Sequence, residues 1–266
     1  MSTSDTTHGQ VVASAAETYE QFFVPALFRQ WAEPLLDAAE VHEGDDVLDV
    51  GCGTGVVARA ALGRVGPAGS VIGLDRNEAM LAVARRTEPA VDWRTGVAEA
   101  LPLDDGSIDR IVSAFVLMFV DDRAEVLREM ARVLRPGGAV AVATWSAVDE
   151  SPGYAAMVDL LDRVIGPDAA DALRAPFCLG TTEQVGDLVA GAFADSTVAR
   201  REGVARFDSV EAWLHTDIRG WTLADSVDDE TYDELLAAAR VELARFVGSE
   251  GRVEFASPAI VAVARA

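Results

Sequence analysis

The sequence predicts an α/β fold, in which a mostly parallel sheet carries helices on both of its faces. Stretches of strand length and of helix length alternate between residues 46 and 146, and this alternation is typical of parallel sheets covered by helices. Within it, the strand residues 47–50, apolar except for Asp49, run directly into Gly51-Cys52-Gly53-Thr54-Gly55. The glycines let the chain turn tightly and lie close to a ligand, and the helix that follows presents free N–H groups to it.

Forty-five residues precede this alternating region. Residues 1–10 are polar and predict a disordered arm. Residues 11–40 predict helices, with breaks at Pro25 and Pro34 because proline removes an N–H donor and disrupts a helix interior.

The alternating region predicts five strands and three helices. The strands are expected at residues 46–50, 70–74, 91–94, 108–114 and 139–145. The helices are expected at residues 55–64, 77–87 and 121–134. The last helix has the clearest signals, because aspartates begin it, arginines end it and Pro136-Gly137-Gly138 stops it.

After residue 146 the rhythm changes and helices predominate. Helices are expected at residues 151–175, 182–194, 208–218 and 229–247, and strands at 196–206 and 257–264. There is no repeat and no low-complexity linker, so we expect residues 11–266 to form a single domain. Its parts are N-terminal helices (11–40), a ligand-binding core (41–146), a cap region with one core strand (147–250) and a final strand (251–266).

Charge excludes several classes of partner. The 266 residues include 44 acids and 22 bases, all of the bases being arginine, for a net charge of −22. Such a surface repels nucleic acid and anionic membranes, so we expect neither as a partner. The acidity fits either a genome that encodes its basic residues as arginine or a host adapted to salt, and both explanations stay open.

Composition points to a cytoplasmic protein. Half of the residues are apolar, and no apolar run reaches membrane-spanning length. The N-terminus lacks the apolar segment of a signal peptide. With only Cys52 and Cys178, the chain has no disulfide framework and no cysteine pair with metal-binding spacing, so we expect no bound metal. The sequence carries no signal for an oligomeric state.

The glycine loop distinguishes between nucleotide ligands. A dinucleotide loop has the pattern Gly-x-Gly-x-x-Gly, which requires glycine at position 56, where this chain has Val56. The second predicted strand ends in Asp75. A carboxylate there can accept two hydrogen bonds from a ribose diol, each worth roughly 1.5–3 kcal/mol. Asp75 could instead cap the helix that starts near Asn77.

Four segments in order carry a resemblance to a known family. They are residues 47–55, residues 71–81 (Val-Ile-Gly-Leu-Asp-Arg-Asn-Glu-Ala-Met-Leu), residues 96–103 (Gly-Val-Ala-Glu-Ala-Leu-Pro-Leu) and residues 127–145, which include Leu134-Arg135-Pro136-Gly137-Gly138. Over residues 40–146 the chain resembles the class I S-adenosylmethionine (SAM)-dependent methyltransferases, in particular the small-molecule branch that includes quinone C-methyltransferases. The resemblance implies a Rossmann-like, seven-stranded, mostly parallel sheet with an antiparallel last strand, here with a helical cap insertion. It also implies SAM as the cofactor and S-adenosylhomocysteine (SAH) as its product.

The resemblance assigns cofactor contacts to the carboxyl ends of the predicted strands, where ligands bind in open parallel sheets. Asp49 and the glycines would cradle the methionine part, Asp75 would hold the ribose and Arg76 would lie along the adenine. The full set is Asp49, Gly51, Gly53, Gly55, Asp75, Arg76, Gly96, Val97, Ala98, Glu99 and Ser113. Family members often carry an acid at the position of Val97, so adenine recognition here would fall to backbone groups or to Glu99. Asp49 could alternatively be a structural acid, and Glu99 a solvated one.

For the acceptor we expect an apolar pocket and, where the acceptor must lose a proton, a base. His215 is the candidate base, because His8 and His42 lie in the predicted arm and in a loop; the alternative is a surface histidine. The pocket candidates are Phe22, Phe115, Met118, Trp145 and Trp213. Each of them could instead belong to the packed core.

We therefore expect residues 11–266 to be a single methyltransferase domain that moves a methyl group from SAM to a small organic acceptor by in-line displacement. Three alternatives stay open. They are a SAM- or SAH-binding protein of the same fold without turnover, a nicotinamide-dependent oxidoreductase, and a binding module without a cofactor.

Overall fold

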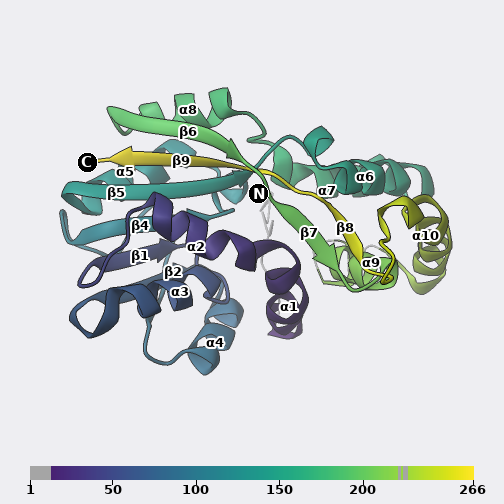
Figure 1. The fold of residues 1–266 in the computed structure, drawn as a ribbon, viewed down its shortest axis with the longest axis horizontal. Helices are drawn as coiled ribbons and strands as arrows, with labels where there is room; N and C mark the ends of the chain where they lie inside the picture. Colours follow the sequence, from purple (N-terminus) through teal and green to yellow (C-terminus); the bar gives the residue numbers. More distant parts are fainter. Residues whose placement is uncertain (1–12, 221–222, 224–226) are drawn as a thin grey trace, which may run out of the picture.

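The computed structural model describes residues 13–220, 223 and 227–266 (Figure 1). It contains a seven-stranded sheet in the order β3-β2-β1-β4-β5-β9-β6. These strands are β1 (Asp46–Val50), β2 (Ser70–Asp75), β3 (Asp92–Thr95), β4 (Ile108–Ala114), β5 (Leu134–Trp145), β6 (Asp195–Arg201) and β9 (Ala259–Arg265). The first five pair in parallel, and β9 lies antiparallel between β5 and β6. The predicted fold class, with its antiparallel last strand, is confirmed. The arm predicted at residues 1–10 lies outside the described residues.

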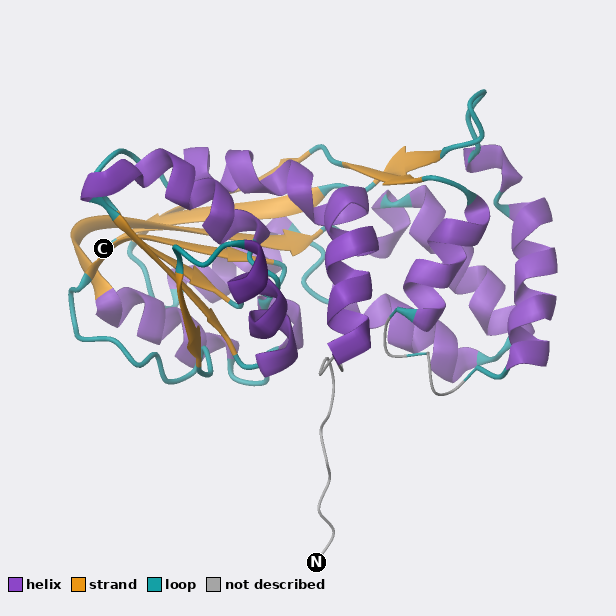
Figure 2. Ribbon diagram, turned by 90° about the horizontal axis from the view of Figure 1, so that it is seen from below, coloured by secondary structure: helices purple, strands orange, loops and turns teal. Residues whose placement is uncertain are grey.

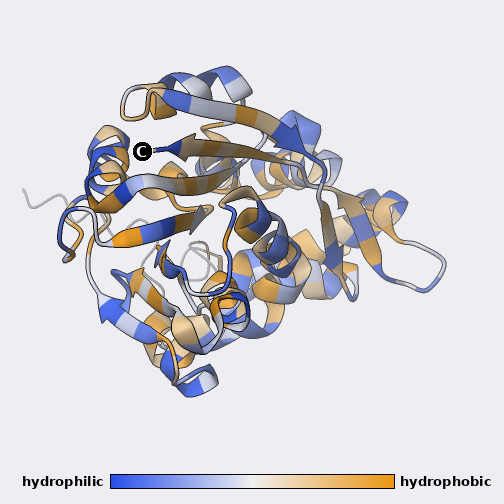
Figure 3. Cartoon of the chain, turned by 60° about the vertical axis from the view of Figure 1, so that its left-hand side comes forward, coloured by the Kyte–Doolittle hydropathy of each residue, from blue (hydrophilic) through white to orange (hydrophobic). Residues whose placement is uncertain are grey.

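Helices cover both faces of this sheet over two separate apolar cores. They are α2 (Arg29–Ala38), α3 (Val56–Val65) and α4 (Glu78–Thr87) on one face and α5 (Arg123–Val133) and α8 (Thr182–Ala190) on the other. Val47 and Val112 belong to the first core, whereas Leu48 and Ile111 belong to the second. Because side chains alternate along a strand, a strand with buried apolar residues on both of its faces needs helices on both faces. Figure 3 shows hydrophobic residues gathered on the strands and on the inward sides of the helices.

Capping side chains explain where two of the predicted helices begin. The side chain of Asn77 accepts hydrogen bonds from the N–H groups of Ala79 and Met80 at the start of α4. The side chain of Asp122 accepts one from the N–H of Glu125 at the start of α5. Each cap satisfies donors that the first turn of a helix leaves unpaired.

The N-terminal helical segment is continuous. It runs from α1 (Ala13–Thr18) through a π-helical stretch, η1 (Tyr19–Phe28), into α2. The breaks predicted at Pro25 and Pro34 are wrong, because both prolines lie inside helix. Near Pro25 the hydrogen bonds already follow a wider spacing, as the N–H of Arg29 donates to the carbonyl of Val24, so the missing donor is tolerated.

The chain after β5 builds a helical cap beside the sheet (Figure 2). Its helices are α6 (Pro152–Val164), α7 (Pro167–Arg174), α9 (Val210–Arg219) and α10 (Asp229–Glu242). A small antiparallel sheet of β7 (Val204–Phe207) and β8 (Val253–Ala256) accompanies them. None of the described helices has the length and the apolar character needed to cross a membrane.

Several boundaries in this region differ from the prediction. The helix expected at 151–175 is divided into α6 and α7, because Gly166, at φ +127°, and Pro167 turn the chain. The strand expected at 196–206 is β6 followed by β7, and the final strand is β8 followed by β9. At Gly203 a Cβ would lie 2.3 Å from the ring of Trp31, so the chain bends there in close contact with α2. The helix expected at 229–247 ends at Glu242.

Candidate active site

The glycine loop after β1 is held tightly against the neighbouring strands. The N–H of Gly51 donates to the carbonyl of Leu74 near the end of β2, at 2.7 Å. Gly51 and Gly55 have φ values of +69° and +90°. A Cβ on Gly51 would lie 2.4 Å from the side chain of Val116, and one on Gly55 would lie 2.2 Å from that of Trp93. Both positions therefore require glycine, for backbone conformation and for space.

Asp75 joins this loop to the tip of β2. Its Oδ2 accepts a hydrogen bond from the N–H of Gly53 at 2.8 Å, and its Oδ1 accepts one from the N–H of Asn77 at 2.8 Å. Burial raises the pKa of the carboxyl, and both hydrogen bonds act to lower it. Asn77 caps α4, so Asp75 does not have the helix-capping role that was its alternative.

The segment after β3 lies beside Asp75. The N–H of Gly96 donates to the backbone carbonyl of Asp75 at 3.1 Å. Val97 is 44% exposed, and Arg76 is also exposed, whereas Ala98 and Glu99 are partly buried. The structure thus brings residues 96–99 to the same edge of the sheet as the glycine loop.

Asp49 and Ser113 lie beneath the loop, inside the sheet. The Oδ2 of Asp49 accepts a hydrogen bond from the N–H of Ala58 in the first turn of α3, at 3.0 Å. The hydroxyl of Ser113 donates to the carbonyl of Val50 at 2.9 Å. Both side chains are buried, and burial raises the pKa of Asp49 to about 7. By accepting this hydrogen bond from Ala58, Asp49 has the structural role that the sequence analysis gave as its alternative.

The N-terminal helix places two polar residues at the loop that the sequence analysis missed. A Cβ on Gly53 would lie 3.8 Å from the ring of Tyr19. The pKa of the Tyr19 hydroxyl is raised by burial and by the carboxylates of Asp75, Glu20 and Asp49. No local signal singles out these two polar residues, because Glu17, Thr18 and Gln21 beside them are polar as well. The three acids thus come from three different elements to one place.

Unpaired polar atoms lie among these acids. The Oε1 of Glu20 pairs with Nη2 of Arg59 at 2.8 Å. Its Oε2 and the hydroxyl of Thr54 are buried with no hydrogen-bond partner among the described residues. Such a place suits a ligand that brings positive charge and N–H donors. The sulfonium and ammonium groups of SAM meet that requirement, whereas the diphosphate of a nicotinamide dinucleotide would face like charges.

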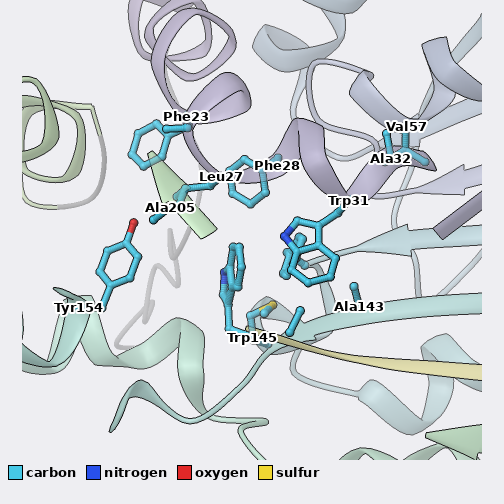
Figure 4. Close-up of a cluster of buried hydrophobic side chains, with 14 of the residues drawn as sticks. Phe23, Leu27, Phe28, Trp31, Ala32, Val57, Ala143, Trp145, Tyr154 and Ala205 are labelled. Carbon is cyan, nitrogen blue, oxygen red and sulfur yellow. The ribbon is translucent and has the colours of Figure 1, made fainter. Parts of the chain in front are cut away.

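An aromatic cavity opens beside the loop, at the carboxyl ends of β4 and β5. The non-atom space between its walls, open solvent at its mouth included, is about 670 Å³. Its walls come from η1, from the strand ends and from the cap, and include Phe23, Phe28, Phe115, Trp145, Tyr154 and Phe177. Figure 4 shows Phe23 and Phe28 on the N-terminal helix across from Tyr154 and Trp145. Tyr19 lines this cavity as well, so the cavity and the glycine loop share a wall.

Phe115 adopts an unusual backbone conformation at this wall. Its φ of +60° lies in the left-handed region that bulky residues rarely enter. Its ring stacks on that of Trp145, with centroids 3.8 Å apart and planes inclined by 22°. The left-handed turn directs the ring from the end of β4 onto the end of β5.

Of the five residues predicted to contact the acceptor, Phe115 and Trp145 line the cavity. Phe22 and His215 are exposed and contact each other, with ring centroids 6.4 Å apart. Met118 is buried, and Trp213 is completely buried against other rings of the cap. The predicted base, His215, therefore lies on the outer side of α9 and not at the cavity.

The ionisable side chain that α9 directs to the cavity is Asp217. It lines the cavity and is 4% exposed. The indole N–H of Trp213 donates to its Oδ2 at 2.7 Å, across one turn of the helix. Burial raises its pKa to about 7. The sequence analysis missed Asp217, although an acid four residues after Trp213 interrupts the apolar face of an amphipathic helix.

A metal has no candidate site in the part of the chain that the structure describes, because no three His, Cys, Asp or Glu side chains gather there in a suitable way. The chemistry of this region depends instead on the glycine loop, the acids around it and the aromatic cavity.

The core of the chain is similar to known proteins. Residues 48–142 match a family described as a methyltransferase domain. The chain is 42% identical over 117 residues to a demethylmenaquinone methyltransferase of Shouchella clausii, covering 42% of this chain and 50% of the relative. It is 38% identical over 149 residues to a ubiquinone/menaquinone biosynthesis C-methyltransferase of Stenotrophomonas maltophilia, covering 53% and 59%. The chain thus spans between half and three fifths of the length of these two curated relatives.

Solved structures show the same fold. The YcgJ protein of Bacillus subtilis superposes with a TM-score of 0.58 at 20% identity, over 89% of this chain and 97% of that one. Phosphoethanolamine N-methyltransferase 2 of Haemonchus contortus, in complex with SAM, superposes with a TM-score of 0.61 at 17% identity, over 96% and 57%. At these identities the likeness shows the fold alone.

Proposed function

We propose that this chain, which carries a class I SAM-dependent methyltransferase domain, transfers the methyl group of SAM to a small organic acceptor held in the aromatic cavity. The observation that carries the proposal is the shared wall: Tyr19 lies over the glycine loop and also lines the cavity. A donor at the loop and an acceptor in the cavity would then be neighbours, as an in-line displacement requires.

The loop and the strand tips would hold the donor. Asp75 uses each oxygen once for a backbone N–H, and a carboxylate has about four lone-pair sites. It therefore retains the capacity to accept both ribose hydroxyls. Gly51, Gly53 and Gly55 let the loop backbone approach the methionine part, while Asp49 supports α3 from below. We assign the adenine to residues 96–99 and Arg76, with Val97 giving an apolar contact where an acid would give a polar one.

Bound SAM supplies an electrophilic methyl group on a sulfonium. The residues of the chain contribute approach geometry and exclusion of water. The aromatic walls suit an apolar or aromatic acceptor, because flat rings can stack on them. The quinones that appear in the names of two curated relatives belong to this class of compound. The acidic surface supports a small-molecule acceptor over nucleic acid, and a cytoplasmic location stays a prediction.

Two measurements test the proposal. Calorimetry should show SAH binding to the full chain and no comparable binding of NADH, whereas tight NADH binding would support an oxidoreductase. Incubation with methyl-labelled SAM and a small-molecule extract, read by mass spectrometry, should yield a labelled product. SAH binding with no labelled product from any extract would favour a SAM-binding protein without turnover.

A further inference from the structure

We propose that Asp217 is the catalytic base of this site and that the acceptor is a phenol or an enol, whose hydroxyl donates a hydrogen bond to the Asp217 carboxylate. The inference deepens the proposed function and rests on it. It concerns the acceptor side of the site, so it can fail while donor binding is intact.

The carboxylate is held in a fixed orientation. Trp213 Nε1 donates to Oδ2 of Asp217 at 2.7 Å. Trp213 is itself completely buried, with its ring 4.7 Å from that of Phe255 and 5.6 Å from that of Phe207, centroid to centroid. Among the described residues, Trp213 is the hydrogen-bond donor to this carboxylate. Oδ2 is thereby occupied, and Oδ1 is left to a ligand in the cavity that Asp217 lines.

No described cation neutralises this carboxylate. On α9 itself, Arg219 donates to the carbonyl of Val227 and to Asp229, and His215 is exposed. The cations on the elements packed against α9 form other pairs: Arg206 of β7 with Glu254 and Arg240 of α10 with Glu211. Glu20 of η1 pairs with Arg59. The titratable group that faces Asp217 is Tyr154 of α6, whose pKa is raised by burial and by the Asp217 charge.

These surroundings make Asp217 a better base than an ordinary carboxylate. Burial disfavours its charged form and raises its pKa to about 7. A base whose pKa is near neutral is well matched to accept a proton at physiological pH. Taking up a proton also neutralises the carboxylate, and a neutral group is more stable than a charged one in an apolar cavity.

A hydroxyl acceptor needs such a base, because it loses its proton when it is methylated. The acceptor oxygen forms a bond to the methyl carbon, the bond from that carbon to sulfur breaks with its electron pair remaining on sulfur, and the hydroxyl proton moves to Oδ1 of Asp217. A sulfonium and a carboxylate thus become a neutral thioether and a neutral acid. An amine attacks through its own lone pair and needs no base for that step. A phenol suits the aromatic walls, and its pKa of about 10 is far closer to that of the base than an alcohol's.

The test uses three probes of the same shape: 2-naphthol, its methyl ether and 2-naphthylamine, each titrated into the SAH-loaded full chain. We expect the wild type to bind 2-naphthol more tightly than the ether, with affinity increasing as the pH rises through about 7 and Asp217 ionises. Asp217→Asn should lose at least about tenfold in affinity for 2-naphthol and lose the pH dependence, while its affinities for the ether and for SAH stay unchanged. Asp187→Asn, on the exposed side of α8, is the matched control.

A second variant tests the orientation by Trp213. Trp213→Phe keeps an aromatic ring but removes the donor that lowers the pKa of Asp217. It should move the pH midpoint of 2-naphthol binding upward. With labelled SAM, 2-naphthol should give its methyl ether in the wild type and about a hundredfold more slowly in Asp217→Asn.

The outcomes separate the two proposals. Equal binding of 2-naphthol and its ether by the wild type, or unchanged 2-naphthol binding in Asp217→Asn, would overturn the phenol inference. Preference for 2-naphthylamine would reassign the acceptor to an amine and also overturn it. Loss of the pH dependence in His215→Gln would move the base role to His215. Failure of the wild type to bind SAH would refute the proposed function itself.

Discussion

The backbone N–H of Gly53 donates a hydrogen bond of 2.8 Å to Oδ2 of Asp75. This contact joins the loop after β1 to the tip of β2, and the two residues are 22 positions apart in the chain. The acid proposed to bind ribose is thus also the acid that orders the glycine loop. Replacing it should affect ligand affinity and loop stability together.

Asp75→Ala should weaken SAH binding by about 2 kcal/mol or more, because it removes charge-assisted hydrogen bonds to the ribose and the acceptor for Gly53. Isothermal calorimetry measures the loss. Asp75→Asn retains one neutral acceptor and should lie between the wild type and the alanine variant, while Asp187→Ala on α8 serves as the control. An unchanged SAH affinity in Asp75→Ala would refute the ribose assignment.

Gly51→Ala should destabilise the fold by roughly 2–4 kcal/mol, the sum of left-handed backbone strain and overpacking against Val116. Gly44→Ala is a matched control, because Gly44 also has a positive φ, of +89°, but a Cβ there meets no atom within 4 Å. It should cost about 1 kcal/mol. Urea unfolding measures both, and adding Val116→Ala to Gly51→Ala should recover part of the loss. Equal costs for the two alanine variants would show that space at Gly51 is not limiting.

Phe115→Gly should be more stable than Phe115→Ala by about 1 kcal/mol, the reverse of the usual order, because alanine keeps the strain of φ +60° and glycine does not. Both variants lose the ring that stacks on Trp145. Ala114→Gly, one residue earlier in β4, should show the ordinary loss of about 0.5–1 kcal/mol. Chemical unfolding compares the three proteins. If Phe115→Ala is the more stable of its pair, the backbone at Phe115 is not strained.

Asp49→Asn should gain stability relative to the wild type as the pH rises. Burial raises the pKa of Asp49 from its usual 3.8 to about 7 in the folded state. The stability that its protonated form contributes is complete below the unfolded pKa and is lost as the pH rises through the folded pKa. Asparagine does not titrate and retains an acceptor for the N–H of Ala58. Measured at pH 4, 6 and 8, the free energy of unfolding of the variant should therefore rise relative to that of the wild type. An equal difference between the two proteins at all three pH values would contradict the raised pKa of Asp49.

The unfolding midpoint should rise between low and molar KCl, because salt screens the repulsion within a chain of net charge −22. Isosmotic sucrose is the control, since it acts without screening charge. A fall in the midpoint at high salt would exclude adaptation to salt as the reason for the acidity.

Local signals predicted the core well, since each strand and helix there carries its own pattern. Clusters of apolar β-branched residues and leucine indicated β1 and β4. The acids at its start indicated α5, and Pro136-Gly137-Gly138 indicated where it ends. The cap was predicted less well. Gly166 and Gly203 divide predicted elements, yet a lone glycine does not reveal whether a ring such as Trp31 will lie against it. The helix through Pro25 was missed because burial of its neighbours outweighs the cost of proline.

The sequence by itself determined the fold class and predicted which residues form the donor side of the site, because the strand, the glycine loop and the acid at the next strand tip each carry a local sequence pattern. Only the tertiary structure decided the acceptor side. Tyr19 and Glu20 reach the loop from a helix at the start of the chain, and Phe115 and Trp145 meet across two strands. Whether α9 directs His215 or Asp217 to the cavity depends on which face of the helix packs inward. That choice results from the burial of Trp213 among distant rings, which no local pattern specifies.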